Sequence, residues 1–305
     1  MMIYCYNDPF SWGRELHAEI EKRKGAAQMM THALQVPDDK GTYTFTCMSR
    51  KEREYVKALN EELGQKKNIV QIPSLKEGRL YDELVEQYKE FGSWMPSTFL
   101  FRSLEQATAN INEVPYPIVS TSNTDHKLNR RLLEQPDDAL AEAIQVFSEN
   151  GKPLPGGNVQ KDYLFWQPNV NRQKVTWHIF MATKRYAVIT EVPSGTNPYD
   201  PNTPISTVEV LSHPMTELLK YVYVFCLDHD FKWVSVEVVA GTDVVQQVAS
   251  PFVLGMSVSW PSWWFERGGM IFETENGTDW KSTGVPAVAL WGLMADAILK
   301  GEFDG

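Results

Sequence analysis

Residues 115–124 read PYPIVSTSNT, a stretch that changes abruptly from apolar to polar. Pro115 and Pro117 flank a tyrosine, and the pair Ile118-Val119 is followed by five hydroxyl and amide residues. A short apolar run between prolines and polar residues is typical of a buried strand. A polar segment follows this buried strand directly, and we expect it to contact a ligand.

The composition is that of an ordinary globular protein. The chain has 305 residues, of which 43% are hydrophobic and 22% charged, so it can bury a core in one large domain or two smaller ones. The net charge of −10 disfavours strong binding to duplex nucleic acid, which needs a basic surface. We recognise no signal peptide and no run of about 20 apolar residues, so no membrane span is expected. Three scattered cysteines without metal-binding spacing are typical of reduced thiols in a cytoplasmic protein.

Strand and helix patterns alternate through the first part of the chain. Strands are predicted at 3–6, 43–47 and 68–73, with helices from Ser11 and over 54–63. This alternation predicts a small α/β layer domain.

The middle of the chain adds further helices around the opening strand. A helix is predicted to end at Gly92, followed by a strand over 98–101. Ser103, with Gln106 three residues later, has the spacing of a capping box and predicts the start of a helix. Another helix is predicted over 137–147.

The remaining part of the chain is predicted to be mostly strand. The expected strands are 162–167, 175–182 and 185–192, then a hairpin of 233–239 and 244–249 around Gly241-Thr242, with helices over 215–227 and 285–299.

The order of these segments resembles the ATP-grasp superfamily, most closely its divergent phage and bacterial members. The resemblance rests on the succession of a helix, MPST, a strand, a capped helix, YPIVS, a loop, a helix and DYLFWQPNV. It implies an α/β (α+β) fold with an N-terminal pre-ATP-grasp-like domain over 1–92 and an ATP-grasp domain with mostly antiparallel sheets over 93–305. The ATP-grasp domain would comprise subdomain A at about 93–165 and subdomain B at about 166–305, which close on a nucleotide.

The resemblance places the phosphate-binding region after the PYPIVS strand. The family has a lysine there, and Thr121 occupies its position; the glycine-rich loop that should follow is missing, because 122–135 contains no glycine. Lys127, Arg130 and Arg131 are therefore the expected phosphate contacts, since cationic side chains bind phosphate where the backbone cannot approach closely. A basic, solvated segment is the alternative.

The resemblance also implies an adenine site at the segment that joins the two subdomains. Trp166, Gln167 and Asn169 belong to this segment, and its backbone groups are expected to hydrogen-bond the adenine edge. Leu164 and Trp166 are expected to wall the slot, and Pro168, which has no N–H, stiffens the crossing. The alternative is a plain strand end.

Magnesium is expected at the hairpin KWVSVEVVAGTDVVQQVAS, residues 232–250. Glu237 fits the family's first metal-binding acid. Gln246 or Gln247, depending on the length of the turn, stands in place of the second acid, so that an amide replaces a carboxylate. Asp243 is expected at the tip of the turn, away from the site.

Two further residues are candidates for catalysis. Arg185, between two central strands, is expected to reach a phosphate or a substrate carboxylate, and His178 stands in TWHIFM, where the family often has an arginine. An ordinary hairpin charge and a structural histidine are the alternatives.

The resemblance implies a ligase that uses ATP and Mg²⁺. Such an enzyme activates a carboxylate as an acyl phosphate, which an amine or similar nucleophile then attacks. The alternative is a catalytically degenerate binding or structural protein, which the departures at Thr121, in 122–135 and at Gln246 or Gln247 favour. A more distant alternative is a carbohydrate- or nucleic-acid-modifying enzyme built on the aromatic segment 259–269. The substrate acid and acceptor stay unidentified, and homo-oligomerisation is left open.

Overall fold

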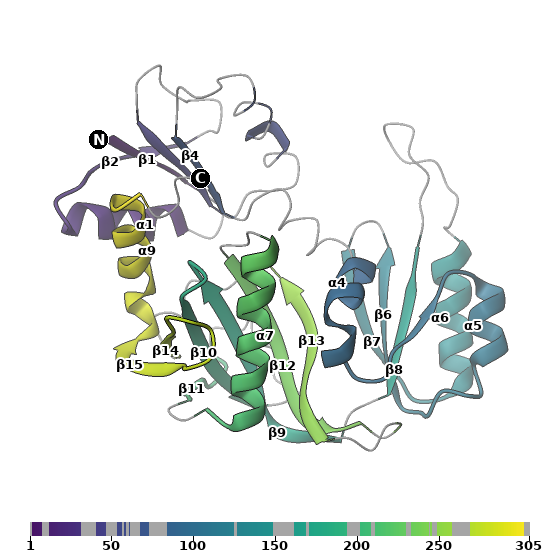
Figure 1. Cartoon of the computed structure of the whole chain (residues 1–305). Helices are drawn as coiled ribbons and strands as arrows, with labels where there is room; N and C mark the ends of the chain where they lie inside the picture. Colours follow the sequence, from purple (N-terminus) through teal and green to yellow (C-terminus); the bar gives the residue numbers. More distant parts are fainter. Residues whose placement is uncertain are drawn as a thin grey trace. The chain divides into compact units, whose positions relative to one another are not determined.

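The computed structural model describes residues 2–7, 12–31, 41–46, 54–56, 58, 61, 68–72, 84–124, 127–148, 162–168, 171–193, 202–208, 211–229, 233–243, 245, 249–257 and 269–301. The chain divides into two compact units (Figure 1). Unit 1 comprises 1–79, 177–237 and 256–305, and unit 2 comprises 80–176 and 238–255. The domain boundaries expected from the sequence stay predictions.

The N-terminal sheet is parallel, as strand–helix alternation predicts. Its order is β2-β1-β3-β4, from β1 (Met2–Tyr6), β2 (Ala26–Met30), β3 (Thr42–Thr46) and β4 (Asn68–Ile72). Alternation along β1 sends Ile3 and Cys5 to one face and Tyr4 and Tyr6 to the other. On the second face Tyr4 stacks on Tyr43, with ring centroids 4.8 Å apart.

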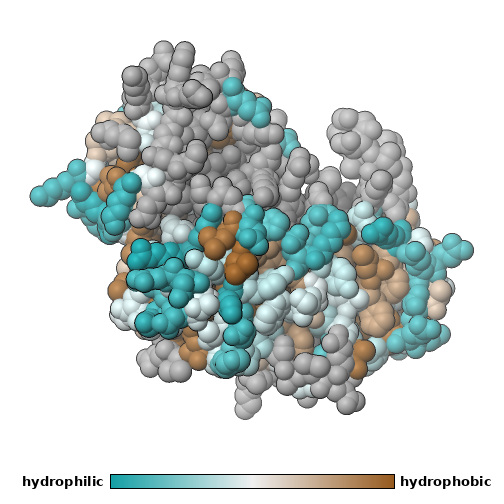
Figure 2. Space-filling view, viewed as in Figure 1, coloured by the Kyte–Doolittle hydropathy of each residue, from teal (hydrophilic) through white to brown (hydrophobic). Residues whose placement is uncertain are grey.

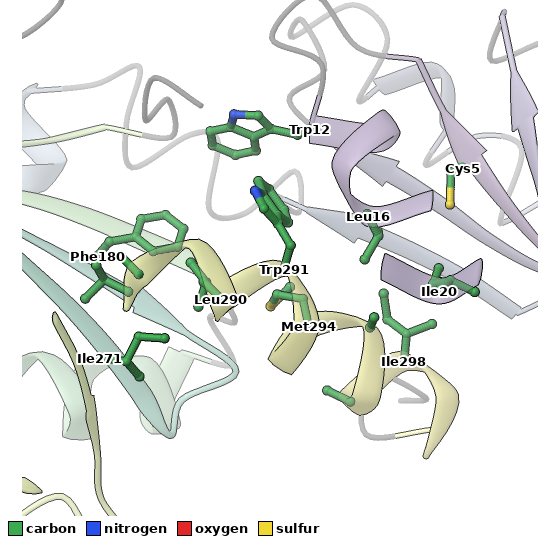
Figure 3. Close-up of a cluster of buried hydrophobic side chains, with 14 of the residues drawn as sticks. Cys5, Trp12, Leu16, Ile20, Phe180, Ile271, Leu290, Trp291, Met294 and Ile298 are labelled. Atoms are coloured by element: carbon green, nitrogen blue, oxygen red, sulfur yellow. The ribbon is translucent and has the colours of Figure 1, made fainter. Parts of the chain in front are cut away.

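Helix α1 (Trp12–Lys22) packs against α9 (Leu290–Leu299), the last helix of unit 1. Figure 3 shows Trp12 and Trp291 facing each other in the buried cluster, and their ring centroids are 5.6 Å apart. At the edge of this contact Arg23 donates to Asp296 Oδ1 at 2.7 Å and to Glu19 Oε2 at 2.6 Å. The two ends of the chain therefore share one core.

Unit 2 contains an antiparallel sheet of order β5-β8-β6-β7. Its strands are β5 (Phe99–Phe101), β6 (Ile118–Thr124), β7 (Lys127–Leu133) and β8 (Leu164–Pro168). Helices α5 (Leu104–Asn110) and α6 (Pro136–Ser148) lie on one side of this sheet, and α4 (Leu84–Phe91) precedes it (Figure 1).

The capping box predicted at the start of α5 is present. Ser103 Oγ accepts a hydrogen bond from Gln106 N at 3.2 Å, which satisfies a helix N–H that has no intrahelical partner. The Gln106 side chain reaches back one residue further than the usual box, since its Oε1 accepts from Arg102 N at 2.9 Å.

The polar segment after PYPIVS is a β-hairpin and not a loop. Strand β6 continues to Thr124, which pairs with Lys127 at the start of β7. Threonine suits a strand, and the register pairs of β6 and β7 run from Ile118 with Leu133 to Thr124 with Lys127, so strand pairing satisfies the backbone of this polar stretch.

The largest sheet has the order β13-β12-β9-β10-β14-β15, with β11 paired to β10. Its elements and the remaining helix are β9 (Asn171–Ala182), β10 (Tyr186–Pro193), β11 (Ser206–Thr207), α7 (His213–His229), β12 (Trp233–Thr242), β13 (Ala249–Ser257), β14 (Met270–Glu273) and β15 (Lys281–Pro286).

The largest differences from the predicted boundaries in this part concern the last helix and the second hairpin strand. The last helix begins at Leu290 and not at 285, because β15 runs to Pro286 and a 3-10 turn over Ala287–Ala289 follows. The second hairpin strand begins at Ala249 and not at 244. There, Asp243 Oδ1 accepts from Val245 N at 2.8 Å, and this local turn ends the strand pairing.

The exposed side of α7 carries a small apolar area near the end of the helix, among hydrophilic residues (Figure 2). Val224 and Leu227 are its exposed apolar residues, at 45% and 46%. Two such residues are ordinary on a protein surface. None of the helices in the described part of the chain is long and apolar enough to cross a membrane.

Candidate functional site

The small sheet of unit 2 has two chemically different faces. Strand pairing aligns Thr121 with Phe165 and Val119 with Gln167, so these four residues share one face. The opposite face holds Ser120, Ser122, Leu164 and Trp166, and α5 and α6 cover it. The residues expected to meet a nucleotide are therefore divided between the two faces.

Trp166 and Leu164 lie in the core beneath α5 and α6. Both side chains are fully buried, and the Trp166 ring meets Phe101 edge-on with centroids 4.7 Å apart. Their expected role as walls of an adenine slot does not agree with this placement. Strand alternation explains the difference, because Gln167, one residue on, is on the other face and only half-buried.

The three expected phosphate-binding cations are also divided. Arg130 is the register partner of Thr121, whereas Arg131 is the partner of Ser120 and Lys127 that of Thr124. Arg131 Nη1 donates to Gln145 Oε1 on α6 at 3.3 Å. By backbone register only Arg130 belongs to the face that carries Thr121, Phe165 and Gln167.

A hydrogen-bonded network within unit 2 fixes the Gln167 side chain. Gln167 Nε2 donates to Thr98 Oγ1 at 2.9 Å, and Thr98 Oγ1 donates to the Pro96 carbonyl oxygen at 2.7 Å. Ser97 N donates to Asp243 Oδ2 at 2.5 Å. The Asp243 side chain is buried, so the MPST segment is joined to both the β12–β13 turn and β8. Asn169, the third residue expected at the adenine edge, lies outside the described residues.

Behind β6, the covered face carries a buried carboxyl group. Glu142 on α6 is 4% exposed, and the buried Ser120 hydroxyl of β6 lies close to its carboxyl group. Burial raises the pKa of Glu142 above its ordinary value, and the nearby Ser120 hydroxyl and Arg131 guanidinium offset this only in part. The Glu142 carboxyl group lies between β6 and α6, on the face that the helices cover. We therefore expect it to affect the stability of the sheet.

The expected metal ligand Glu237 lies on β12 and is half-buried. The strands that flank β12 are β13, ASPFVLGMS, and β9, NRQKVTWHIFMA, and neither contains Asp or Glu. Gln246 and Gln247 lie outside the described residues. Within the described ranges no group of three His, Cys, Asp or Glu could hold a metal ion. Proteins commonly bind Mg²⁺ through one or two carboxylates together with the phosphates of a nucleotide. Glu237 alone is therefore compatible with a single Mg²⁺ held jointly with nucleotide phosphates.

The two expected catalytic residues belong to the β9–β10 hairpin. Arg185 is exposed in its turn, forms an ion pair with Glu273 of β14, and has its Cζ 5.6 Å from the centroid of the Tyr186 ring. Its carbonyl oxygen also accepts from Thr274 N at 3.1 Å. These contacts give the guanidinium a local structural role. The backbone of His178 is part of β9.

Sequence reasoning did not predict the contacts that Thr98 and Asp243 make around Gln167 and the MPST segment. Asp243 was expected at the tip of the turn, away from the site, and the structure shows it 1% exposed and accepting two backbone hydrogen bonds. The one available signal was its position in Gly-Thr-Asp, since aspartate after a turn often accepts from the backbone two residues on. Its partner Ser97 is 146 positions away, and no local pattern predicts that contact.

Comparisons with known proteins give likenesses in structure only. Neither a family model nor a curated protein matches the sequence. A RimK-domain ATP-grasp protein from Sphaerobacter thermophilus is similar, with a TM-score of 0.59, 16% identity, and coverage of 98% of this chain and 99% of that one.

Two ligases solved with precursor peptides are similar as well. PsnB, complexed with a minimal precursor, Mg and ADP, has a TM-score of 0.63 at 10% identity, covering 99% of this chain and 97% of that one. The macrocyclase MdnC from Microcystis aeruginosa, bound with precursor peptide MdnA, has a TM-score of 0.61 at 9% identity, covering 98% and 99%. The α+β architecture and these likenesses along almost the whole of both chains show that this protein has the ATP-grasp fold.

Proposed function

We propose that this protein is an ATP-dependent ligase that activates a carboxylate as an acyl phosphate and transfers it to an amine or similar nucleophile. The observation that carries the proposal is the ATP-grasp fold along 98% and 99% of the chain. The two peptide-bound neighbours favour a peptide as the molecule that carries the reacting group. A cytoplasmic location agrees with the use of ATP.

The residues on the face of the small sheet opposite α5 and α6 are assigned to the nucleotide. Gln167 would contact the base, and Thr121 and Arg130 would contact phosphates, a hydroxyl and a guanidinium being good donors to phosphate oxygens. Glu237 would hold Mg²⁺, which when bound neutralises phosphate charge. Arg131 and Trp166 are left out of this assignment because they belong to the covered face.

A second candidate is a protein that binds nucleotide without turning it over. The observation that favours it is the absence of Asp and Glu from both strands that flank β12, which leaves Glu237 as the one acid in β9, β12 and β13. Thr121 in place of lysine removes a further charge. Because phosphoryl transfer depends on neutralising the charge of the transferred group, a site with fewer charges would bind more readily than it would catalyse.

Thermal unfolding of the full chain in increasing Mg-ATP tests nucleotide binding. Ligand that binds the folded state alone stabilises it by about 2.7 kcal/mol at one hundred times Kd, so we expect the unfolding temperature to rise with Mg-ATP. An unchanged temperature at millimolar Mg-ATP would contradict both candidates. ADP formation that depends on added acidic peptides supports the ligase, and saturable binding without any ADP supports the second candidate.

A further inference from the structure

We propose that Gln167 selects adenine through its side-chain oxygen, and that Thr98 and Asp243 are the positioning residues that keep this oxygen directed toward the base. The inference rests on the proposed nucleotide site and names what sets its base specificity. All three residues belong to unit 2.

The orientation of the Gln167 amide follows from the single proton of the Thr98 hydroxyl. Thr98 Oγ1 is 2.7 Å from the Pro96 carbonyl oxygen, which can only accept, so the hydroxyl proton is used there. The second contact of Oγ1, at 2.9 Å to the Gln167 amide, must then be one in which threonine accepts. The amide nitrogen therefore faces Thr98, and the amide oxygen is the atom left to meet a ligand.

Asp243 holds the Pro96–Thr98 segment in place. Its Oδ2 accepts from Ser97 N at 2.5 Å and its Oδ1 from Val245 N at 2.8 Å, and the side chain is 1% exposed. Hydrogen bonds to a buried carboxylate are short and strong, so the residue between Pro96 and Thr98 is tightly fixed. This fixes the carbonyl that orients Thr98, and through Thr98 the amide of Gln167.

An oxygen presented to a purine distinguishes adenine from guanine. Adenine carries an amino group at position 6, which donates to that oxygen, whereas guanine carries a carbonyl oxygen there, which repels it. A freely rotating glutamine amide would accept either base, because its oxygen and nitrogen are nearly the same in size. Discrimination between the two bases therefore requires a fixed orientation of the amide. Removing the Thr98 hydroxyl, which is the partner of the amide nitrogen, should abolish this discrimination.

The position of Gln167 is compatible with contact to a base. It is half-buried, lies opposite Val119, and shares its face with Phe165 and Thr121, away from α5 and α6. The Phe165 ring on this face is 6.1 Å from that of Tyr88, measured between centroids. Phe165 and Thr121 are buried, at 3% and 5% exposed, so among these four residues the half-buried Val119 and Gln167 are the ones that a base could reach. A polar group beside apolar neighbours is the kind of surroundings that purine sites have.

The test compares ADP and GDP binding to the full chain by titration calorimetry. Thr98→Val removes the hydroxyl at nearly constant volume, and we expect it to reduce the ratio of the two dissociation constants from about tenfold or more toward one. Thr98→Ser keeps the hydroxyl and should keep the ratio. Thr108→Val is the matched control, because the Thr108 hydroxyl likewise donates to a backbone carbonyl, that of Leu104 in α5, at 2.8 Å.

The outcomes separate this inference from the proposed function. If the wild type binds ADP more tightly than GDP and Thr98→Val keeps the full preference, the positioning role is wrong and the nucleotide site stands. Equal binding of ADP and GDP by the wild type also overturns the inference alone. No binding of either nucleotide overturns both. If Thr98→Val does not fold, Gln167→Lys decides, since a side chain that only donates should reverse the preference toward GDP.

Discussion

Thr121 on β6 and Arg130 on β7 are register partners in the hairpin that follows PYPIVS. Thr121 occupies the position where the resembled family has a lysine. Its register partner on the neighbouring strand is Arg130, a residue that carries the positive charge that Thr121 lacks. Arg131, the next residue, is aligned with Ser120 and hydrogen-bonds Gln145 on the covered face. Two adjacent arginines therefore belong to opposite faces of the sheet by register and have different expected roles.

Arg130→Ala should weaken ADP binding by about tenfold or more, because a charge-assisted contact to phosphate is worth about 1.5–3 kcal/mol. Arg131→Ala is the matched control and should leave the dissociation constant within about twofold. Titration of both variants with ADP checks this. Equal losses in the two variants would show that the register does not decide which arginine meets the phosphates.

Glu237→Gln should abolish most of the gain in ADP affinity that Mg²⁺ provides, because the substitution removes the one carboxylate of β9, β12 and β13. The measurement is the ratio of ADP dissociation constants with Mg²⁺ and with a chelator. Glu273→Gln, which changes an acid that pairs with Arg185, should leave this ratio unchanged. A ratio that survives in Glu237→Gln would exclude Glu237 from the metal site.

Glu142→Gln should stabilise the protein at neutral pH. Burial raises the pKa of Glu142 above its unfolded value, so the folded state binds the proton more tightly and loses stability as the pH rises from the unfolded toward the folded pKa. That loss is complete above the folded pKa, and glutamine, which has no charge to bury, avoids it. Unfolding temperatures measured from pH 4 to pH 8 should show an advantage for the variant that shrinks as the pH falls.

Glu134→Gln serves as the control for this pH series, because Glu134 is exposed just after β7. Its unfolding temperature should follow that of the wild type at every pH. A Glu142→Gln protein that is less stable than the wild type at pH 7 would mean that attraction between Glu142 and Arg131 outweighs the cost of burial.

Ser103→Ala should lower the free energy of unfolding by about 1 kcal/mol, the usual cost of removing a helix N-cap. The Ser103 hydroxyl accepts from Gln106 N, and alanine leaves that N–H without a protein partner. Ser148→Ala, which removes an exposed hydroxyl at the far end of α6, should change stability by less. Denaturant unfolding of both variants distinguishes them, and equal effects would contradict the cap.

Trp291→Ala should be the most destabilising of these substitutions, at about 3–5 kcal/mol, because it opens a cavity beside Trp12 in the core that α1 and α9 share. Val224→Ala on the exposed side of α7 is the control and should cost far less. Thermal unfolding measures both. A Trp291→Ala protein as stable as the control would show that the contact between α1 and α9 contributes little.

Local patterns predicted much of the fold. The N-terminal strands at 3–6, 43–47 and 68–73, the strand at 118, the capped helix after Ser103 and the helix over 137–147 each carry a short-range signal in periodicity or capping, and the structure has them all. The strand β2 (Ala26–Met30) was not predicted. The hairpin of β6 and β7 was missed because its residues are polar, and strand pairing rather than apolar alternation forms it. For such a segment tertiary context outweighs composition.

The candidate site was less predictable because strand alternation decides it residue by residue. Trp166 and Gln167 are adjacent in the sequence and lie on opposite faces of the sheet. Both were predicted to contact the nucleotide, and their side chains cannot do so from the same face. Asp243 is joined to Ser97 across a distance in sequence that no motif spans. The chemistry of a single residue can be predicted from the sequence. The face of the sheet on which it lies can be assigned only when the pairing register of its strand is known.

The shared core of α1 and α9 has a consequence for the order in which the protein is made. Residues 12–22 are synthesised long before residues 290–299, which cover part of their apolar side. Until translation reaches that point, the exposed side of α1 is a surface that chaperones would shield and that invites aggregation. A nascent chain halted before residue 290 should therefore be captured by a holdase, and one extended past residue 299 and clear of the exit tunnel should escape it.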